Sequence, residues 1–183
     1  GKKAVDKYIE DNEFELLILG HNDSLPLILN ELDDFMTKGS KVTVACDSLP
    51  ENADTACSGY SNLDMSWIEK NIYERRVLEE ILKKDVRNIL LLSDGDDEGK
   101  DADSRSLLLL LQIRAIAAAK GIEFNITSEM DSVDNQNLLR VANVNDFVVG
   151  SKITNLMLTQ ISENRELTSF FTTLLTADGS ELY

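Results

Sequence analysis

The stretch from Leu16 to Pro26, LLILGHNDSLP, holds the first residues whose types and spacing could bind a ligand. An apolar strand that runs into a glycine turn is where Rossmann-type domains hold the phosphates of a nucleotide. The dinucleotide pattern G-x-G-x-x-G would need glycine at positions 20, 22 and 25, and the chain has Gly20, Asn22 and Leu25. The turn is therefore a weakened phosphate site, which keeps the amides at the start of the following helix as donors.

The polar residues around this turn complete the candidate nucleotide site. Asn22 tolerates left-handed backbone geometry better than most residues, so we expect it to keep the bend. Asp47 follows the next apolar run, where a ribose-binding acid would lie, but an ordinary strand-end turn or N-cap explains it equally well. His21 lies in the turn without a Ser or Cys motif, so no catalytic triad can be argued. The predicted nucleotide-binding residues are Gly20, His21, Asn22, Asp47, Ser93 and Asp94.

An acidic segment, SDGDDEGKDADSR at 93–105, is a candidate cation site. Its first acids have the spacing of an EF-hand loop, but the bidentate glutamate expected at position 12 is replaced by Arg105, so it is not an EF-hand. The carboxylates could still bind Ca²⁺ or Mg²⁺, or they could form a solvated loop that suits the dipole of the next helix. The candidate metal ligands are Asp94, Asp96, Asp97 and Glu98.

Composition narrows the function classes. The net charge of −15 argues against contact with nucleic acid or an anionic membrane surface. Two cysteines, Cys46 and Cys57, and one histidine leave no disulfide framework and almost no ligands for a structural zinc, which suits a reducing compartment. The longest strongly apolar run, at 106–113, is far shorter than the roughly 20 residues of a membrane-spanning helix.

Apolar periodicity predicts the elements that position these residues. The expected strands are 14–19, 41–46, 63–68, 86–92, 122–127 and 146–149, and the expected helices are 25–38, 73–83, 102–120 and 134–141. Strands that alternate with helices imply right-handed crossovers and a parallel sheet covered on both faces. The sequence therefore predicts an α/β fold with a doubly wound, Rossmann-like parallel sheet.

The character of the chain changes after Gly150. Two apolar stripes at helical spacing follow, one from Ile153 to Ile161 and one from Leu167 to Leu175. They could pack back on the sheet domain or form a face for a second copy or another domain. We expect a Rossmann-like domain at 1–150, with 151–183 supplying two helices and the start of a further subdomain of a longer protein.

Five segments together carry a resemblance to a known family. They are ILGHN at 18–22, GSKVTV at 39–44, VRNILLLSD at 86–94, DADSR at 101–105 and DGSELY at 178–183. In this order they resemble the RCK (regulator of potassium conductance, TrkA-N-like) domains of potassium channels and transporters. The diverged form in CASTOR and POLLUX-type ion channels and their bacterial relatives is the most similar, because its first turn also keeps a single glycine before an aromatic residue and asparagine.

The resemblance implies a regulatory domain on the cytoplasmic side of a membrane, not an enzyme. Such domains pair through crossover helices after the sixth strand and assemble into rings beneath the transmembrane pore region of the same polypeptide. Ligand binding then biases the gate, and the ligands implied are NAD(H), an adenine nucleotide or Ca²⁺. The expected interface residues are Ile153, Leu156, Met157, Phe170, Phe171 and Leu174. The alternatives are an NAD-dependent enzyme and a ligand-free Rossmann scaffold used only for assembly.

Overall fold

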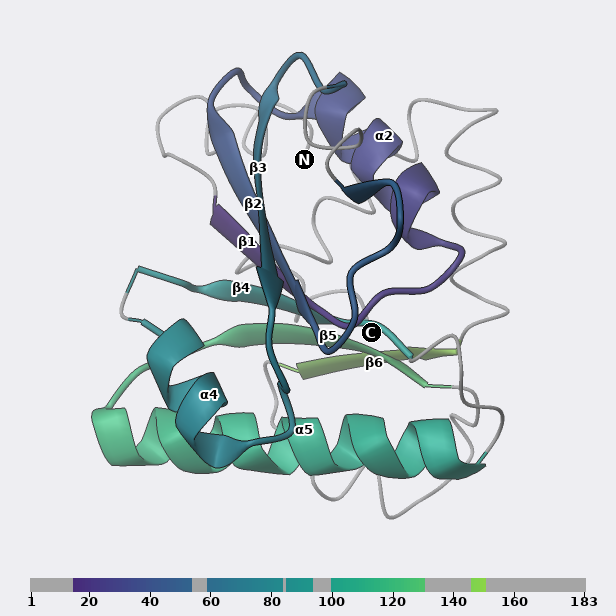
Figure 1. Ribbon diagram of the computed structural model, residues 1–183. Helices are drawn as coiled ribbons and strands as arrows, with labels where there is room; N and C mark the ends of the chain where they lie inside the picture. Colours follow the sequence, from purple (N-terminus) through teal and green to yellow (C-terminus); the bar gives the residue numbers. More distant parts are fainter. Residues whose placement is uncertain (1–14, 54–58, 84, 94–99, 131–145, 151–183) are drawn as a thin grey trace.

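Strands connected by helices or loops make up the part of the chain that the computed structural model describes, residues 15–53, 59–83, 85–93, 100–130 and 146–150 (Figure 1). The strands are β1 (Glu15–Leu19), β2 (Ser40–Cys46), β3 (Leu63–Glu69), β4 (Asn88–Leu91), β5 (Asn125–Met130) and β6 (Asp146–Gly150). The helices are α2 (Leu25–Phe35), α4 (Arg75–Ile81) and α5 (Lys100–Lys120).

The strands form one sheet in the order β3-β2-β1-β4-β5-β6, and every neighbouring pair is parallel. Leu17 in β1, for example, pairs with Thr43 on one side and Ile89 on the other. The strand order reverses between β1 and β4, which makes the carboxyl ends of these two strands the topological switch point. The predicted doubly wound, Rossmann-like sheet is confirmed.

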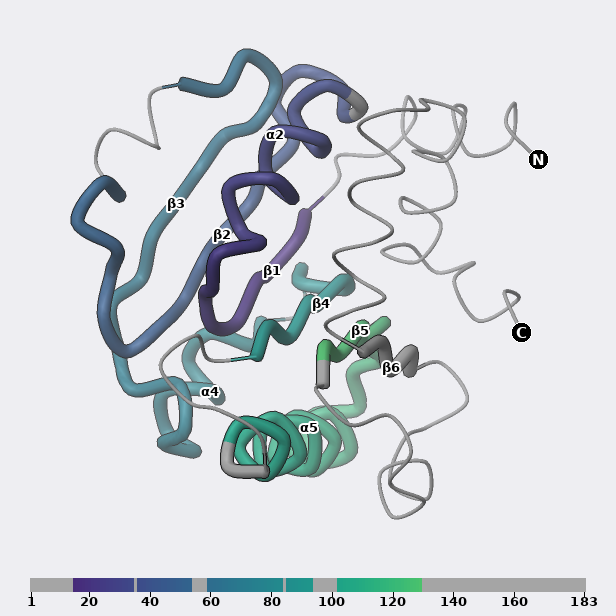
Figure 2. Tube along the Cα trace, turned by 90° about the vertical axis from the view of Figure 1, so that its right-hand side faces the viewer, coloured from purple at the N-terminus to yellow at the C-terminus, as the bar shows by residue number. Residues whose placement is uncertain are grey.

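Side chains of β1 alternate between two hydrophobic cores. Leu16 and Ile18 pack in the core beneath α2, and Leu17 and Leu19 pack in the core beneath α4 and α5. Each of these four side chains is at most 2% exposed, because β1 is covered on both faces. Figure 2 looks along the axis of α5 and shows it below the sheet, with α2 beside β1 and β2. Such two-sided burial explains why the central strands are continuous apolar runs in the sequence.

The helix α2 begins at Leu25, as expected, after Ser24 at the N-cap, and it has a proline in its first turn. Its apolar stripe is buried at Leu25, Ile28, Leu29 and Leu32. The helix ends at Phe35, earlier than the predicted stop at Gly39, because Met36 already has an extended backbone and is buried in the same core.

A carboxylate on α2 fixes the entry to β3. Asp33 Oδ1 accepts the amides of Asn62 and Leu63 at 2.7 and 3.1 Å, and Asp33 Oδ2 accepts the amide of Ser61 at 3.0 Å. The Asn62 side chain donates in return to the Asp33 carbonyl. These bonds hold the start of β3, an edge strand of the sheet.

Among the other elements, β5 and α4 also differ from their predicted bounds. The strand β5 begins at Asn125 rather than at residue 122, because Gly121 closes α5 with a positive φ of 64° and Phe124 first fills the core. The ladder then starts where the Asn125 amide donates to Arg87. The helix α4 is shorter than its apolar pattern suggested. The expected helix at 134–141 and everything assigned to 151–183 lie outside the described residues.

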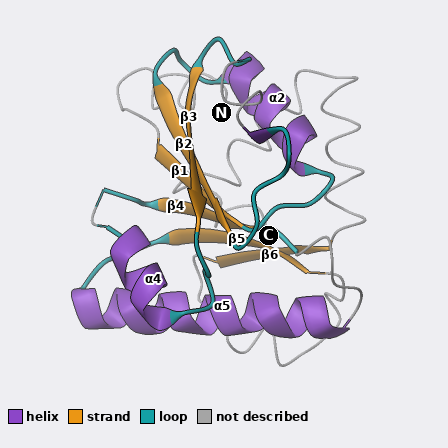
Figure 3. Ribbon diagram, in the orientation of Figure 1, coloured by secondary structure: helices purple, strands orange, loops and turns teal. Residues whose placement is uncertain are grey.

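Figure 3 shows that the helices lie along the sheet as covering layers. Among the described residues, no helix is both long and apolar enough to cross a membrane. Cys46 is buried at the end of β2, and Cys57 lies outside the described residues.

The first turn depends on Gly20, where the chain leaves β1. Gly20 has φ +89°, and a Cβ built there would lie 2.8 Å from the carbonyl oxygen of Leu92. The Leu92 amide in turn donates to the Leu19 carbonyl at 2.9 Å. Glycine is therefore needed here both for its backbone conformation and for the close approach of the chain after β4.

We predict that Gly20→Ala destabilises the domain more than Gly39→Ala. Both positions have φ near +90°, where an alanine costs about 1 kcal/mol because the backbone is left-handed. A Cβ at Gly39 would meet nothing within 4 Å, so Gly39→Ala should lose only this amount of stability. The clash at Gly20 should add at least about 1 kcal/mol in the free energy of unfolding. Urea denaturation of the two variants measures the difference, and equal losses would contradict the steric argument.

Candidate functional site

Three loops meet at the carboxyl ends of the strands around the switch point. The first turn, residues 20–24, lies between the chain that follows β2, at Ser48, and the chain that follows β4, at Ser93. Near the end of β5, Glu129 faces the same place. Open α/β sheets bind ligands at this edge, so the contacts made by the turn decide what the site can hold.

Asn22 joins the turn to two neighbouring strand ends. Its Nδ2 donates to the Ser93 carbonyl at 3.0 Å and to Glu129 Oε1 at 2.8 Å. Its Oδ1 accepts the Ser24 amide at 2.9 Å, and its backbone carbonyl accepts the Leu25 amide at 3.1 Å. One side chain therefore braces the turn internally and ties it across the sheet.

The reason that we gave for Asn22 from sequence was wrong. We expected a left-handed backbone at this residue, but positive φ among the described residues occurs at glycines alone, Gly20, Gly39 and Gly121. Asn22 keeps the bend through its side chain, whose oxygen replaces a backbone acceptor for the Ser24 amide.

Glu129 is the site residue that sequence reasoning missed. It is 3% exposed, and the backbone carbonyl of the same residue accepts the Ser93 hydroxyl at 3.2 Å. A carboxylate in such a place requires donors, and the Asn22 amide supplies one at 2.8 Å. The sequence signal was an acid directly after the apolar run IEFNIT, but the predicted strand ended at Thr127 and left Glu129 in a loop.

His21 and Asp47 both act at the end of β2. The Nε2 of His21 donates to the Ser48 carbonyl at 2.9 Å, and the Cys46 thiol donates to the same oxygen at 3.3 Å. Asp47 Oδ1 accepts the Ile72 amide at 3.1 Å, so this carboxylate fixes the link between β3 and α4. The sequence allowed Asp47 to be either a strand-end turn residue or a ribose ligand, and this bond is of the strand-end kind. Contact of Asp47 with a ribose stays a prediction.

The structure brings four of the six predicted nucleotide-binding residues to the turn and its rim: Gly20, His21, Asn22 and Ser93. Asp47 lies beyond the end of β2, with its carboxylate toward Ile72. Asp94 and the other candidate metal ligands, Asp96, Asp97 and Glu98, lie outside the described residues. Within the described ranges, no three His, Cys, Asp or Glu side chains gather closely enough to hold a metal ion.

In this turn, backbone amides that a phosphate would need as hydrogen-bond donors already have acceptors in the protein. The amides of Gly20, Ser24 and Leu25 already donate to protein oxygens at 2.9 to 3.1 Å. Asn22 occupies the place of the second glycine, where the backbone of a dinucleotide site approaches the pyrophosphate. The Glu129 carboxyl group lies within hydrogen-bond distance of that side chain.

Comparisons with known proteins connect the chain to ion channels. No protein-family profile matches it. The chain is 25% identical to the probable ion channel CASTOR of Oryza sativa subsp. japonica, with 91% of this chain and 23% of the relative covered. It is 26% identical to the ion channel CASTOR of Lotus japonicus, with 69% and 18% covered. The chain thus spans less than a quarter of the length of either relative.

The fold has a counterpart among solved structures. The structure of the human SLO3 gating ring superposes with a TM-score of 0.54 at 12% identity, over 74% of this chain and 24% of that one. This likeness concerns the fold alone. With the two CASTOR channels, it confirms the resemblance to the RCK domain of a CASTOR-type channel that the sequence motifs indicated.

We predict that Asn22→Asp destabilises the domain by about 2 kcal/mol or more at neutral pH. The variant keeps the acceptor for Ser24 but loses both N–H bonds, and it places a second carboxylate beside Glu129. Chemical denaturation measures the loss.

The matched control is Asn30→Asp, which adds the same charge at an exposed position of α2. It should change stability by less than about 0.5 kcal/mol. Adding Glu129→Gln to Asn22→Asp should recover part of the loss, because the carboxamide can donate to the new aspartate. Equal losses of stability in Asn22→Asp and Asn30→Asp would show that the hydrogen bonds of the Asn22 side chain do not stabilise the fold.

Proposed function

We propose that this chain is a regulatory domain of an ion channel that works within an assembly of such domains. The observation that carries the proposal is the resemblance to two CASTOR channels, over 91% and 69% of the chain, joined to a fold shared with a channel gating ring. The domain would lie on the cytoplasmic side of the membrane and act on the pore region of the same polypeptide. The conducted ion would be a cation such as potassium.

The switch point serves this function as a structural joint rather than as a dinucleotide site. The bonds of Asn22 and His21 connect the turn to the ends of β2, β4 and β5, so movement at one strand end is transmitted to the others. The amides of Gly20, Ser24 and Leu25 already donate to protein oxygens, and this disfavours a diphosphate there. A cation bound by Asp94, Asp96, Asp97 and Glu98 suits a chain of net charge −15 better.

We predict that NAD, NADH, ADP and ATP leave the melting temperature unchanged and that Ca²⁺ raises it. A ligand at 100 times its dissociation constant stabilises a domain by about 2.7 kcal/mol, which a thermal-shift assay resolves easily. Asp96→Asn/Asp97→Asn should abolish the calcium shift, and Asp34→Asn, an exposed acid on α2, should retain it. A rise in melting temperature with NAD that Asp47→Ala removes would contradict this prediction and favour a nucleotide-binding enzyme or sensor.

A surface for self-association is available on α5. Leu108 and Leu111 are 46% and 45% exposed, and Ala115 and Ala118 continue the exposed row with spacings of three and four residues. From Ser104 to Lys120 the helix has no acidic residue, in a chain with 33 of them. Two copies of this acidic chain would repel least along such a face, and its leucines offer apolar area to bury.

The helix α5 is also held firmly enough to act as an interface. Lys120 Nζ donates to the carbonyls of Glu79 and Leu82 at 2.7 and 3.3 Å, at the end of α4. Near the other end, the Arg105 guanidinium lies 5.4 Å from the centre of the Tyr73 ring. We propose that this face contributes to assembly together with the expected interface at 153–174, which lies outside the described residues.

We predict that Leu108→Glu/Leu111→Glu shifts the protein toward smaller species in sedimentation velocity. The substitutions put two charges into an apolar contact but leave the fold intact, because both side chains are exposed. Asn30→Glu on the exposed side of α2 is the control and should sediment as the unchanged protein does. An unchanged distribution for the leucine variant would exclude this face as an interface, whatever the terminal helices do.

A further inference from the structure

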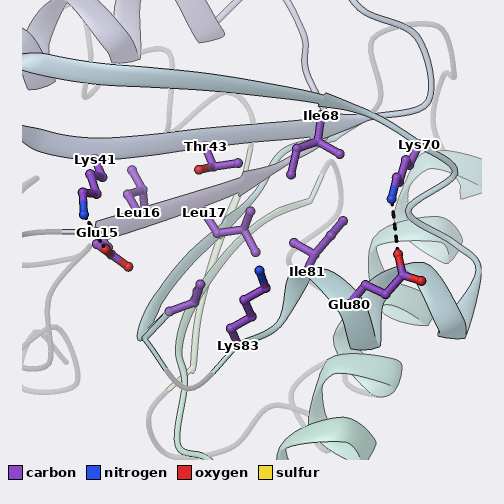
Figure 4. Close-up of a pocket in the computed structure, with 11 residues that line it drawn as sticks. Glu15, Leu16, Leu17, Lys41, Thr43, Ile68, Lys70, Glu80, Ile81 and Lys83 are labelled. Atoms are coloured by element: carbon purple, nitrogen blue, oxygen red, sulfur yellow. Dashed lines mark hydrogen bonds and ion pairs between the residues drawn. The ribbon is translucent and has the colours of Figure 1, made fainter.

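The face of the sheet that carries α4 has a cavity away from the first turn. The helix α4 is only seven residues long, and Ile68 of β3 is partly buried where it packs against the core beneath α4 and α5. A cavity of about 390 Å³ lies between the sheet and the end of α4 (Figure 4). This volume falls in the range of small-molecule sites, roughly 300 to 1,000 Å³.

One side of the cavity is apolar. Leu17 of β1, Ile68 of β3 and Ile81 of α4 line it. Leu17 and Ile81 are buried members of the core beneath α4 and α5, and Ile68 is partly buried against that core. Thr43 of β2 adds a hydroxyl on the sheet side, as Figure 4 shows. A ligand with an apolar body would extend the core outward over these side chains.

Charged side chains surround the apolar side of the cavity. Glu15 pairs with Lys41 at 3.6 Å at one end, and Lys70 pairs with Glu80 at 3.2 Å at the other. Lys83 is a third lysine in the lining, and its ammonium points between Leu17 and Ile81 in Figure 4. Three lysines against two glutamates leave the cavity with a net charge of +1, in a chain whose net charge is −15.

Backbone hydrogen bonds, rather than an ion pair with a carboxylate, position Lys83. Its amide donates to the Ile81 carbonyl at 3.0 Å, and its carbonyl accepts the Val86 amide at 3.1 Å, so the turn after α4 is fixed. Within the described part of the chain, no carboxylate forms an ion pair with Lys83. The ammonium is therefore available to an anion that reaches the cavity.

We propose that this cavity binds a small amphipathic carboxylate, with its head at Lys83 and its apolar body along Leu17, Ile68 and Ile81. A single ammonium without an acidic partner compensates one negative charge. A phosphate monoester would bring close to two charges and leave the excess beside Glu15 and Glu80, so a monoanion fits better. The inference is independent of the assembly face and of the first turn, and it gives the domain a ligand site on the opposite face of the sheet from α2.

Octanoate is the probe, titrated into the full 183-residue chain by calorimetry. We expect a dissociation constant on the order of 0.1 to 1 mM, as suits about ten non-hydrogen atoms. Octanamide, the neutral isostere, should bind at least about tenfold more weakly, and octyl phosphate should also bind more weakly. Butanoate, four methylenes shorter, should lose roughly 100-fold.

Lys83→Gln should reduce the affinity for octanoate to that for octanamide, because it removes the ammonium and keeps a polar side chain of similar length. Lys38→Gln, at an exposed lysine before Gly39, is the matched control and should bind octanoate unchanged. Ile68→Ser should weaken octanoate and octanamide alike, since both place the same chain on the apolar side.

Methyl NMR spectra locate the ligand without relying on the variants. Octanoate should shift the methyl signals of Leu17, Ile68 and Ile81. Binding that is insensitive to Lys83→Gln, shifts confined to the exposed Leu108 and Leu111, or the absence of octanoate binding at 10 times the expected constant, about 10 mM, would each overturn the proposal.

Discussion

The Asn22 amide is the interaction on which the arrangement of the switch point depends. The side chain makes three hydrogen bonds, and two of them reach residues 71 and 107 positions away in the sequence. Parallel strands are joined by long crossovers rather than by tight turns, so side-chain hydrogen bonds of this kind are what connects their carboxyl ends directly. A glycine at position 22 would make none of these bonds, and the edge of the sheet would be more open to a phosphate.

This constraint connects the structure to the function that we propose. A dinucleotide enzyme keeps the switch point open because its cofactor fills the crevice. Here protein side chains form hydrogen bonds across it: Asn22 toward β4 and β5, and His21 toward the end of β2. An internally braced edge is what a domain needs if its task is to pass displacement to neighbouring domains. The charge of −15 and the channel relatives agree with this interpretation.

Local patterns predicted the fold well and the site only in part. Strands such as LLIL and NILL were recognisable because two-sided burial makes them continuously apolar, and Gly20 was recognisable because it ends such a run. The partners of Asn22 were not, because a single sequence does not show which distant side chains face one another. Glu129 was missed for a related reason: its burial follows from its neighbours in the sheet, not from its own segment. The bounds of β5 shifted because Phe124 is used to fill the core before the ladder begins.

The three amide bonds at Asp33 have a consequence for the long connection between β2 and β3. The connection is fixed where it leaves the sheet, by the His21 bond to Ser48, and fixed where it returns, by Asp33 at residues 61–63. Its two ends keep their separation whatever the length of chain between them, and longer closed loops cost little additional entropy. The stretch is therefore a permissive point for insertion, where a reporter or a binding module could be grafted without disturbing the register of β3.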